Sequence, residues 1–229
     1  MSMKKTYVVS GIDTGVGKTV ATGLMAKYLV SRGIDAITVK MVQTGNDGFS
    51  EDLAAHRAIA GMERLPEDSM GLTAPQTFKF PSSPLLAARL EGRSVDTAKI
   101  AAAVETCAAK HQVTLVESAG GLDVPLTEDV LTADFAAEQG WPLILVTCGR
   151  LGAINHALLS LDCAKMHGIP LAGVVHNSQF SADPLIDADV VDAVDRHLSR
   201  LGYPRNIVRI PSMAPSSPAP VIDFSEIFA

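Results

Sequence analysis

The stretch Ser10-Gly11-Ile12-Asp13-Thr14-Gly15-Val16-Gly17-Lys18-Thr19 decides the fold of this chain. It follows an apolar run at 7–9 that is typical of a buried strand, and from Val20 onward apolar residues recur at helical spacing. A strand, a glycine-rich turn, Gly-Lys-Thr and a helix in this order predict a phosphate-binding P-loop. Glycines let backbone N–H groups approach phosphate oxygens, and the helix N-terminus adds unpaired amides and a positive dipole end. We therefore expect Lys18 to contact the β- and γ-phosphates and the Thr19 hydroxyl to bind Mg²⁺.

The loop departs from the ordinary pattern in one respect. The glycine expected at position 12 lies one position earlier, at Gly11, so the loop is one residue longer. The alternative interpretation is a strand, turn and helix whose glycines serve only the turn. We favour a nucleotide site because Gly17-Lys18-Thr19 follows the loop in register, with a strand and a helix on the expected sides.

Length and composition limit the possible classes of protein. The chain has 229 residues, 47% hydrophobic and 19% charged, so we expect a sizeable core and one domain over residues 1–229. The net charge of −6 argues against general binding to nucleic acid or to an acidic membrane surface. No apolar run reaches ~20 residues, so no membrane span is predicted. The three cysteines lack metal-binding spacing and are expected to be buried thiols of a cytoplasmic protein.

Apolar runs alternate with helical patterns along the rest of the chain. Predicted strands lie at 36–42, 113–121, 142–146, 171–177 and 207–210, and predicted helices at 20–32, 51–61, 84–92, 94–110, 131–139, 153–168 and 184–201. Residues 62–81 and the proline-bearing tail 211–229 are expected to be irregular. The alternation predicts an α/β fold of the P-loop NTPase kind, a mostly parallel twisted sheet of about seven strands with helices on both faces.

Charged residues end or follow these strands at the edge where open α/β sheets bind ligands. Lys40 interrupts an apolar strand, and the alternative to a ligand contact is a lysine that reaches solvent from the strand end. Glu117 precedes two glycines, where P-loop proteins place an acidic Mg²⁺ ligand, the alternative being an acidic strand cap. Asp52 by itself is typical of a charge at a helix N-terminus. The glycine turn at 149–156 is either an anion site or an ordinary turn, and the residues leave this open.

Several stretches together resemble the dethiobiotin synthases of biotin biosynthesis. Residues 11–19 resemble that family's loop G-T-D-T-x-V-G-K-T, including its displaced first glycine. The other matching stretches are residues 39–45 with K-P-V-x-[ST]-G, 116–121 with V-E-G-A-G-G, 151–156 with L-G-x-I-N-H, and Val175-His176-Asn177 and Ile210-Pro211 with the later nucleotide-side signatures. The matches run in the family's order from the first strand to the tail.

The resemblance implies an ATP-dependent ring closure, with Mg²⁺ as cofactor. The substrates would be 7,8-diaminopelargonic acid and CO₂ or bicarbonate. One amine takes up CO₂ as a carbamate, whose oxygen attacks the γ-phosphate to give a carbamic–phosphoric anhydride. The second amine then displaces phosphate, which closes the ureido ring of dethiobiotin and leaves ADP and phosphate. The resemblance also implies a homodimer with its active site at or near the interface.

The resemblance assigns roles to individual residues. Lys18, Lys40 and Thr14 would act catalytically, by drawing the γ-phosphate and the carbamate together. The nucleotide would contact Thr14, Gly15, Val16, Gly17, Lys18, Thr19, Val20, Asp52, Glu117, Asn177 and Pro211. Mg²⁺ would be held by Thr19, Asp52 and Glu117. Thr44 would contact the substrate amine or carbamate, and a turn of the other subunit would hold the substrate carboxylate through Gly152, Ala153, Ile154 and Asn155.

Departures from the family pattern and rival classes of protein do not displace this interpretation. Ser118, Met41 and Ile12 replace a common glycine, proline and threonine, but none removes a group that the chemistry needs. A partition or septum-site ATPase would carry a second signature lysine early in the loop, where this chain has Asp13. An ATP-dependent amide ligase of cofactor synthesis usually adds a glutaminase domain with a nucleophilic cysteine, for which there is no room. A non-catalytic nucleotide-binding module is disfavoured by the acidic and basic residues at the strand ends.

Overall fold

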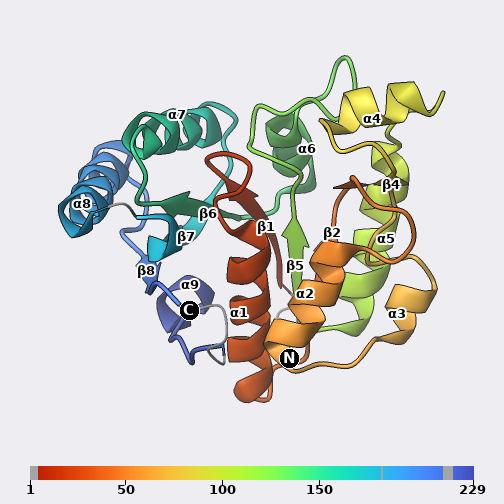
Figure 1. Cartoon of the computed structure of the whole chain (residues 1–229), viewed down its shortest axis with the longest axis horizontal. Coiled ribbons are helices and arrows are strands. Elements are labelled where there is room, and N and C mark those ends of the chain that lie inside the picture. Colours follow the sequence, from red (N-terminus) through yellow and green to blue (C-terminus); the bar gives the residue numbers. More distant parts are fainter. Residues whose placement is uncertain (1–4, 182, 214–218) are drawn as a thin grey trace.

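The computed structural model describes residues 5–181, 183–213 and 219–229, which Figure 1 shows arranged around a twisted sheet. Six strands lie in the order β2-β5-β1-β6-β7-β8, and each neighbouring pair is parallel. These strands are β1 (Lys5–Gly11), β2 (Ala36–Lys40), β5 (Val113–Glu117), β6 (Leu143–Cys148), β7 (Leu171–Asn177) and β8 (Ile207–Ile210). A small separate sheet pairs β3 (Gln43–Thr44) with β4 (Thr77–Phe78). The predicted parallel α/β fold is confirmed, with six strands in the main sheet instead of about seven.

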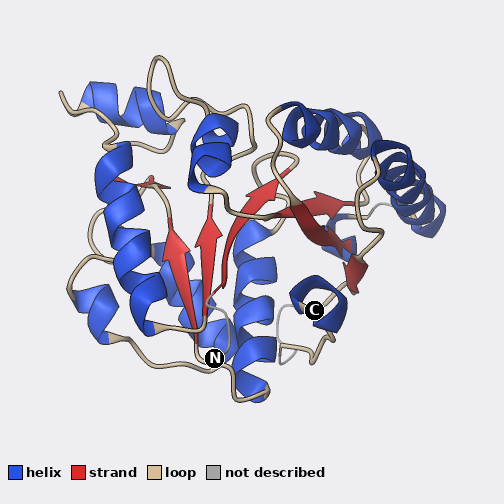
Figure 2. Cartoon of the chain, turned by 180° about the vertical axis from the view of Figure 1, so that it is seen from behind, coloured by secondary structure: helices blue, strands red, loops and turns tan. Residues whose placement is uncertain are grey.

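Helices cover both faces of the sheet. They are α1 (Lys18–Ser31), α2 (Glu51–Ala60), α3 (Pro66–Ser69), α4 (Pro84–Leu90), α5 (Thr97–Lys110), α6 (Thr132–Gln139), α7 (Ala153–Met166), α8 (Pro184–Leu201) and α9 (Ser225–Phe228). The two opposite views in Figures 1 and 2 show α1 and α2 against one face. In the strand order, the chain moves from β1 toward the β2 edge, but the connections from β2 to β5 and from β5 to β6 move back toward the β8 edge. Right-handed crossovers therefore place α5 and α6 on the other face. Among the described residues, no helix has both the length and the apolar character to cross a membrane.

The strands of the main sheet contribute a large part of the core and also hold polar exceptions to it. Every residue of β2, β5 and β6 is buried, which is the pattern of parallel strands covered by helices on both sides. Thr38, Lys40 and Glu117 are buried within these strands although their side chains are polar or charged. Because a buried charge is costly without a partner, these positions indicate where the fold has been shaped for a purpose other than packing.

Four segments differ from the prediction, and one of them is the strand predicted at 113–121, which ends at Glu117. Strand β2 ends at Lys40, two residues early, because the chain then leaves the main sheet to pair β3 with β4. Residues 62–81, predicted as irregular, contain the short elements α3 and β4. The tail, predicted as loop, ends in α9, although residues 214–218 lie outside the described part. The tail is anchored by Phe224, which is fully buried with its ring 5.9 Å from that of Tyr28.

Candidate active site

The P-loop joins β1 to α1 at the carboxyl edge of the sheet. Gly15 and Gly17 have φ angles of 75° and 92°, a left-handed conformation that suits glycine. A Cβ on Gly17 would lie 2.2 Å from Asn177 Nδ2, so a larger residue does not fit where β7 ends against the loop. Lys18 Nζ donates to the Asp13 carbonyl at 2.9 Å and thus lies inside the turn. The loop therefore surrounds its cation with backbone groups, the arrangement that a phosphate site needs.

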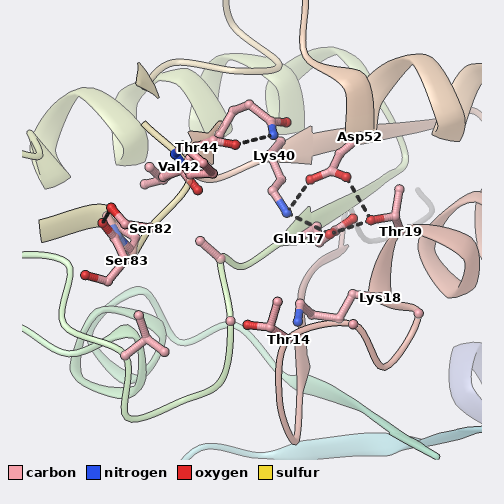
Figure 3. Close-up of a pocket in the computed structure, with 18 of the residues that line it drawn as sticks. Thr14, Lys18, Thr19, Lys40, Val42, Thr44, Asp52, Ser82, Ser83 and Glu117 are labelled. Atoms are coloured by element: carbon pink, nitrogen blue, oxygen red, sulfur yellow. Dashed lines mark hydrogen bonds and ion pairs between the residues drawn. The ribbon is translucent and has the colours of Figure 1, made fainter. Parts of the chain in front are cut away.

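Thr19, Lys40, Asp52 and Glu117 form a carboxylate cluster beside the loop, shown in Figure 3. The Lys40 ammonium lies 2.7 Å from Asp52 Oδ2 and 2.7 Å from Glu117 Oε1. The Thr19 hydroxyl lies 3.0 Å from Asp52 Oδ1 and 3.1 Å from Glu117 Oε1. Lys40 is only 6% exposed, so the alternative of a lysine that reaches solvent is wrong.

The ion pairs shift the pKa values of both charged partners. Burial alone would raise the pKa of Glu117, but the Lys40 charge and the hydrogen bond to His56 outweigh burial, so the pKa lies well below its usual value. Burial alone would lower the pKa of Lys40, but Glu117 and Asp52 outweigh it and raise the pKa. Both groups are therefore charged at neutral pH. Burial, followed by repulsion from Lys40, lowers the pKa of Lys18 to about 8.

Sheet register explains why the cluster forms. Lys40 and Glu117 are register partners across β2 and β5, so their side chains emerge on the same face of the sheet. Helices α1 and α2 pack on this face, and each contributes a residue near its N-terminus. Thr19 is the second residue of α1, and Asp52 is the second residue of α2, whose N-cap is the Ser50 side chain. Four segments far apart in the sequence thus meet at one point.

The donor atoms of the cluster fit a Mg²⁺ ion. Mg²⁺ prefers oxygen ligands and is usually held by one or two carboxylates together with substrate phosphates. Thr19 supplies a hydroxyl, and Asp52 and Glu117 supply two carboxylates that both contact it. No group of three or more His, Cys, Asp or Glu side chains in the described ranges could hold a metal alone. A metal held by this cluster would take further oxygen ligands, from water or phosphate, to complete its coordination.

The P-loop and the carboxylate cluster line the same cavity, whose volume is about 720 Å³. Lys18, Lys40 and Glu117 all face it, so the three groups are not divided among separate sites. Thr44 and the neighbouring Ser82 and Ser83 line the wall away from the P-loop. The cavity is large enough for a small-molecule ligand. Its lining combines the charged groups of the P-loop and the carboxylate cluster with these three hydroxyl groups and with apolar residues such as Val42 and Pro81.

Other residues named from the sequence lie outside this cavity. The Asn177 amide is buried behind the loop, where it donates to the Val16 carbonyl at 3.0 Å. Val20 is half-buried on α1, and Pro211 is exposed just after β8. The structure places Gly152, Ala153, Ile154 and Asn155 at the start of α7, and none of them lines the cavity. Within one chain, this turn and the carboxylate cluster are thus separate features.

Two residues that do not line the cavity support the site, and the sequence had predicted a role for neither. His56 of α2 is fully buried and contacts Glu117 Oε2 at 2.7 Å. Arg150, in the turn before α7, forms an ion pair with Asp13 of the P-loop. A signal for His56 was present, because it follows Asp52 by four residues, the spacing that places two side chains on one face of a helix.

The parallel sheet, the glycine loop and the carboxylate cluster define a P-loop nucleotide-binding protein. Solved structures of similar fold include the signal recognition particle receptor FtsY from Elizabethkingia anophelis in complex with GDP, with a TM-score of 0.54 and 12% identity over 91% of this chain and 58% of that chain. A ParA family ATPase from Chlorobium tepidum aligns with a TM-score of 0.53 and 16% identity over 93% of this chain and 86% of that chain. At these identities the likeness shows the fold alone.

Sequence comparison identifies the family. A family profile described as an AAA domain matches residues 5–219. The ATP-dependent dethiobiotin synthetase of Chlorobaculum tepidum is 44% identical over 195 residues, which cover 85% of this chain and 82% of that protein. A second such synthetase, from Pasteurella multocida, is 43% identical over 202 residues, or 86% of this chain and 93% of that protein. The chain belongs to the dethiobiotin synthetase family.

Proposed function

We propose that this protein is an enzyme that converts 7,8-diaminopelargonic acid and CO₂ to dethiobiotin, with ATP consumed to ADP and phosphate. The observation that carries the proposal is the convergence of Lys18, Lys40 and the carboxylate cluster on one cavity, in a chain of this family. A reaction between a triphosphate and a carbamate joins two anions, and this cavity supplies two ammonium groups where they would meet.

Each residue of the site has a defined part in the proposed reaction. Lys18 would bind the β- and γ-phosphates from within the loop, and Thr14 would donate its hydroxyl to the γ-phosphate or the carbamate. Lys40 would hold the carbamate oxygen against the γ-phosphorus, so that the P–O bond forms as ADP leaves. The second amine then attacks the carbamoyl carbon, phosphate leaves and the ring closes. Mg²⁺ held by Thr19, Asp52 and Glu117 would neutralise phosphate charge.

The hydroxyl wall of the cavity suits the amine end of the substrate. Thr44, Ser82 and Ser83 line the cavity beyond Lys40, at the side away from the P-loop. Hydroxyl oxygens accept hydrogen bonds from an amine, whereas Lys40 can only donate to a carbamate. The proposal therefore orients the substrate with its amines between this wall and the P-loop.

The proposal also assigns sites for the nucleotide base and for the substrate tail. Asn177 has one amide N–H and one oxygen lone pair left beyond its bonds to Val16 and Gln179, which suits recognition of adenine. Pro211 would close over the base. The α7 turn at residues 152–155 would bind the substrate carboxylate from the second subunit of a homodimer, which agrees with its position away from the cavity of its own chain. We place this dimer in the cytoplasm.

The test is a reaction of the purified protein with diaminopelargonate, bicarbonate, Mg²⁺ and ATP, analysed by mass spectrometry. Dethiobiotin and ADP should form in equal amounts, and both should vanish when the diamine is omitted. ATP hydrolysis that continues without the diamine, with no ring product, would reject the proposal in favour of an ATPase. Size-exclusion chromatography with light scattering tests the dimer separately.

A further inference from the structure

A buried hydrogen-bond relay of residues that do not line the cavity reaches the carboxylate cluster. His56 is fully buried and uses both ring nitrogens: Nε2 lies 2.7 Å from Glu117 Oε2, and Nδ1 lies 3.1 Å from Thr38 Oγ1. Arg57 donates to the same Thr38 oxygen at 2.7 Å. The proposed reaction uses none of these three side chains directly, yet each is buried and partnered at a hydrogen-bond distance.

The direction of the relay follows from the chemistry of its members. A guanidinium only donates, so the Thr38 oxygen accepts from Arg57. An ionised carboxylate only accepts, so His56 Nε2 carries a proton and donates it to Glu117 Oε2. The Thr38 hydroxyl offers one hydrogen and two lone pairs, so it can meet both the guanidinium and His56 Nδ1. Arg57 and Thr38 thus hold the imidazole ring from the side away from Glu117.

The far end of the relay is anchored outside the site. Arg57 donates through Nε and Nη2 to the two oxygens of Asp68, at 3.0 and 2.7 Å. The Thr73 hydroxyl donates to Asp68 Oδ1 at 2.7 Å, and the Thr73 carbonyl accepts from the backbone N–H of Lys40 at 2.7 Å. The segment 68–73 thus fixes both the relay and the end of strand β2. A bidentate arginine–carboxylate pair of this kind sets position as well as charge.

Helix and strand spacing explain why the relay lies next to the cluster. Four residues of α-helix and two residues of β-strand both advance the chain by roughly 6 Å. Asp52 and His56 are four apart on α2, and Lys40 and Thr38 are two apart on β2. Asp52 therefore meets Lys40 while, one step along, His56 meets Thr38. His56 reaches Glu117 on the next strand from this second position.

We propose that His56 is a positioning residue that holds Glu117 so that Oε1 faces Thr19 and the metal. This inference rests on the proposed metal-dependent function. Glu117 is 1% exposed and its Oε2 contacts the fully buried His56, so loss of this bond would leave a buried carboxylate oxygen without that partner. His56 uses Oε2, which leaves Oε1 as the oxygen that contacts Lys40 and Thr19. Partners that orient a metal ligand in this way govern its affinity for the metal.

Three substitutions at one position test the proposal. His56→Gln places an amide N–H near the position of Nε2 and keeps the donor to Glu117. His56→Asn places its amide near Nδ1 and keeps only the contact to Thr38, and His56→Leu keeps neither. Binding of Mn²⁺ to the full-length protein with a non-hydrolysable ATP analogue is measured by electron paramagnetic resonance, alongside the thermal midpoint of each variant. His197→Leu is the matched control, because His197 is also a buried histidine whose Nε2 contacts a carboxylate, that of Asp162 at 2.7 Å, between α7 and α8.

We expect His56→Leu and His56→Asn to weaken Mn²⁺ binding by about 10–100-fold. His56→Gln should recover most of that loss, and His197→Leu should bind Mn²⁺ as the wild type does. A purely structural role would lower the thermal midpoint of the Gln and Asn variants alike and leave their Mn²⁺ affinities equal, which would overturn the proposal. If His56→Leu fails to fold, the Gln and Asn pair still decides. Metal binding is read without turnover, so a wild type that binds Mn²⁺ but forms no dethiobiotin would reject the proposed function and not the role of His56.

Discussion

Replacing Lys40 with methionine separates the stabilising role of this lysine from its proposed catalytic role. Lys40→Met removes the ammonium that lies 2.7 Å from Asp52 and Glu117, but keeps the length of the side chain. Removal of one partner from a buried ion pair typically costs about 3–5 kcal/mol. Here Glu117 keeps its contacts with His56 and Thr19, and the Asp52 side chain is 26% exposed to water. We therefore expect a smaller loss of unfolding free energy, about 2–3 kcal/mol, and a Tm lower by about 4–12 °C.

The pH dependence of this loss has a definite sign. The folded pKa of Glu117 is lowered, so its stabilising effect is present above the unfolded pKa of about 4.3 and is lost as pH falls through the folded pKa. The folded pKa of Lys40 is raised, so its effect is present below the unfolded pKa of about 10.4 and is lost as pH rises through the folded pKa. The stability difference between wild type and Lys40→Met should thus be largest between about pH 5 and 10 and shrink on both sides.

The assay combines urea unfolding, followed by the fluorescence of the single tryptophan Trp141, with mass-spectrometric measurement of dethiobiotin. Lys40→Met should lower kcat by at least about 10²–10³-fold, the cost of losing one group that stabilises transition-state charge. The double variant Lys40→Met/Glu117→Gln should regain stability but not activity. Lys110→Met is the control, because Lys110 pairs with Glu67 at 2.9 Å while its own side chain is half exposed. A kcat within tenfold of wild type would contradict the catalytic role of Lys40, and a double variant as unstable as the single one would contradict its role in stability.

Three further outcomes are expected. Because the pKa of Lys18 is lowered to about 8, its ammonium is lost as pH rises through that value, and ADP affinity measured by calorimetry without metal should fall above about pH 8. Asp52→Asn should raise the Mg²⁺ concentration for half-maximal activity by about tenfold, with a smaller change in KM for diaminopelargonate, as steady-state kinetics would show. Phe224→Ala should lower the unfolding free energy by about 3–5 kcal/mol in urea titrations, because the ring is fully buried, while kcat is retained in the folded fraction.

The sequence was sufficient to predict the elements at the phosphate site, and the physical reason is local. A P-loop is one continuous stretch, so its strand, turn and helix can be recognised without knowledge of neighbours. Lys40 and Glu117 were also recognisable, because a charge inside an apolar run needs an explanation wherever the run lies. Their contact was not, because 77 residues separate them and the register of β2 on β5 is set by the assembled sheet.

Three other features of the structure were not predicted from the sequence: the role of His56, strand β4 and helix α9 of the tail. His56 lies on a helix whose pattern is satisfied by alanines and leucine, and only its distance from Asp52 marked it. Strand β4 has two residues, too few for a periodic signal. The tail was predicted as loop from its prolines, but the buried Phe224 lies beyond the last of them and anchors α9 to the core. Roles assigned to Asn177, Pro211 and residues 152–155 stay predictions, because they depend on ligands or on a second subunit.

The charges around the cavity explain why the proposed reaction needs a divalent cation. Lys18 and Lys40 bring two positive charges, and Asp52 and Glu117 bring two negative charges that contact Lys40 directly. Lys40 is thus already neutralised by the carboxylates, so that without metal the attraction for a triphosphate is left to Lys18 and the backbone N–H groups of the P-loop. A metal bound to those carboxylates would neutralise them in place of Lys40. The Lys40 ammonium would then be available to a carbamate, and the cavity would have a net positive charge for the phosphates. On this reasoning metal binding and the availability of Lys40 are one event, governed by the position of Glu117.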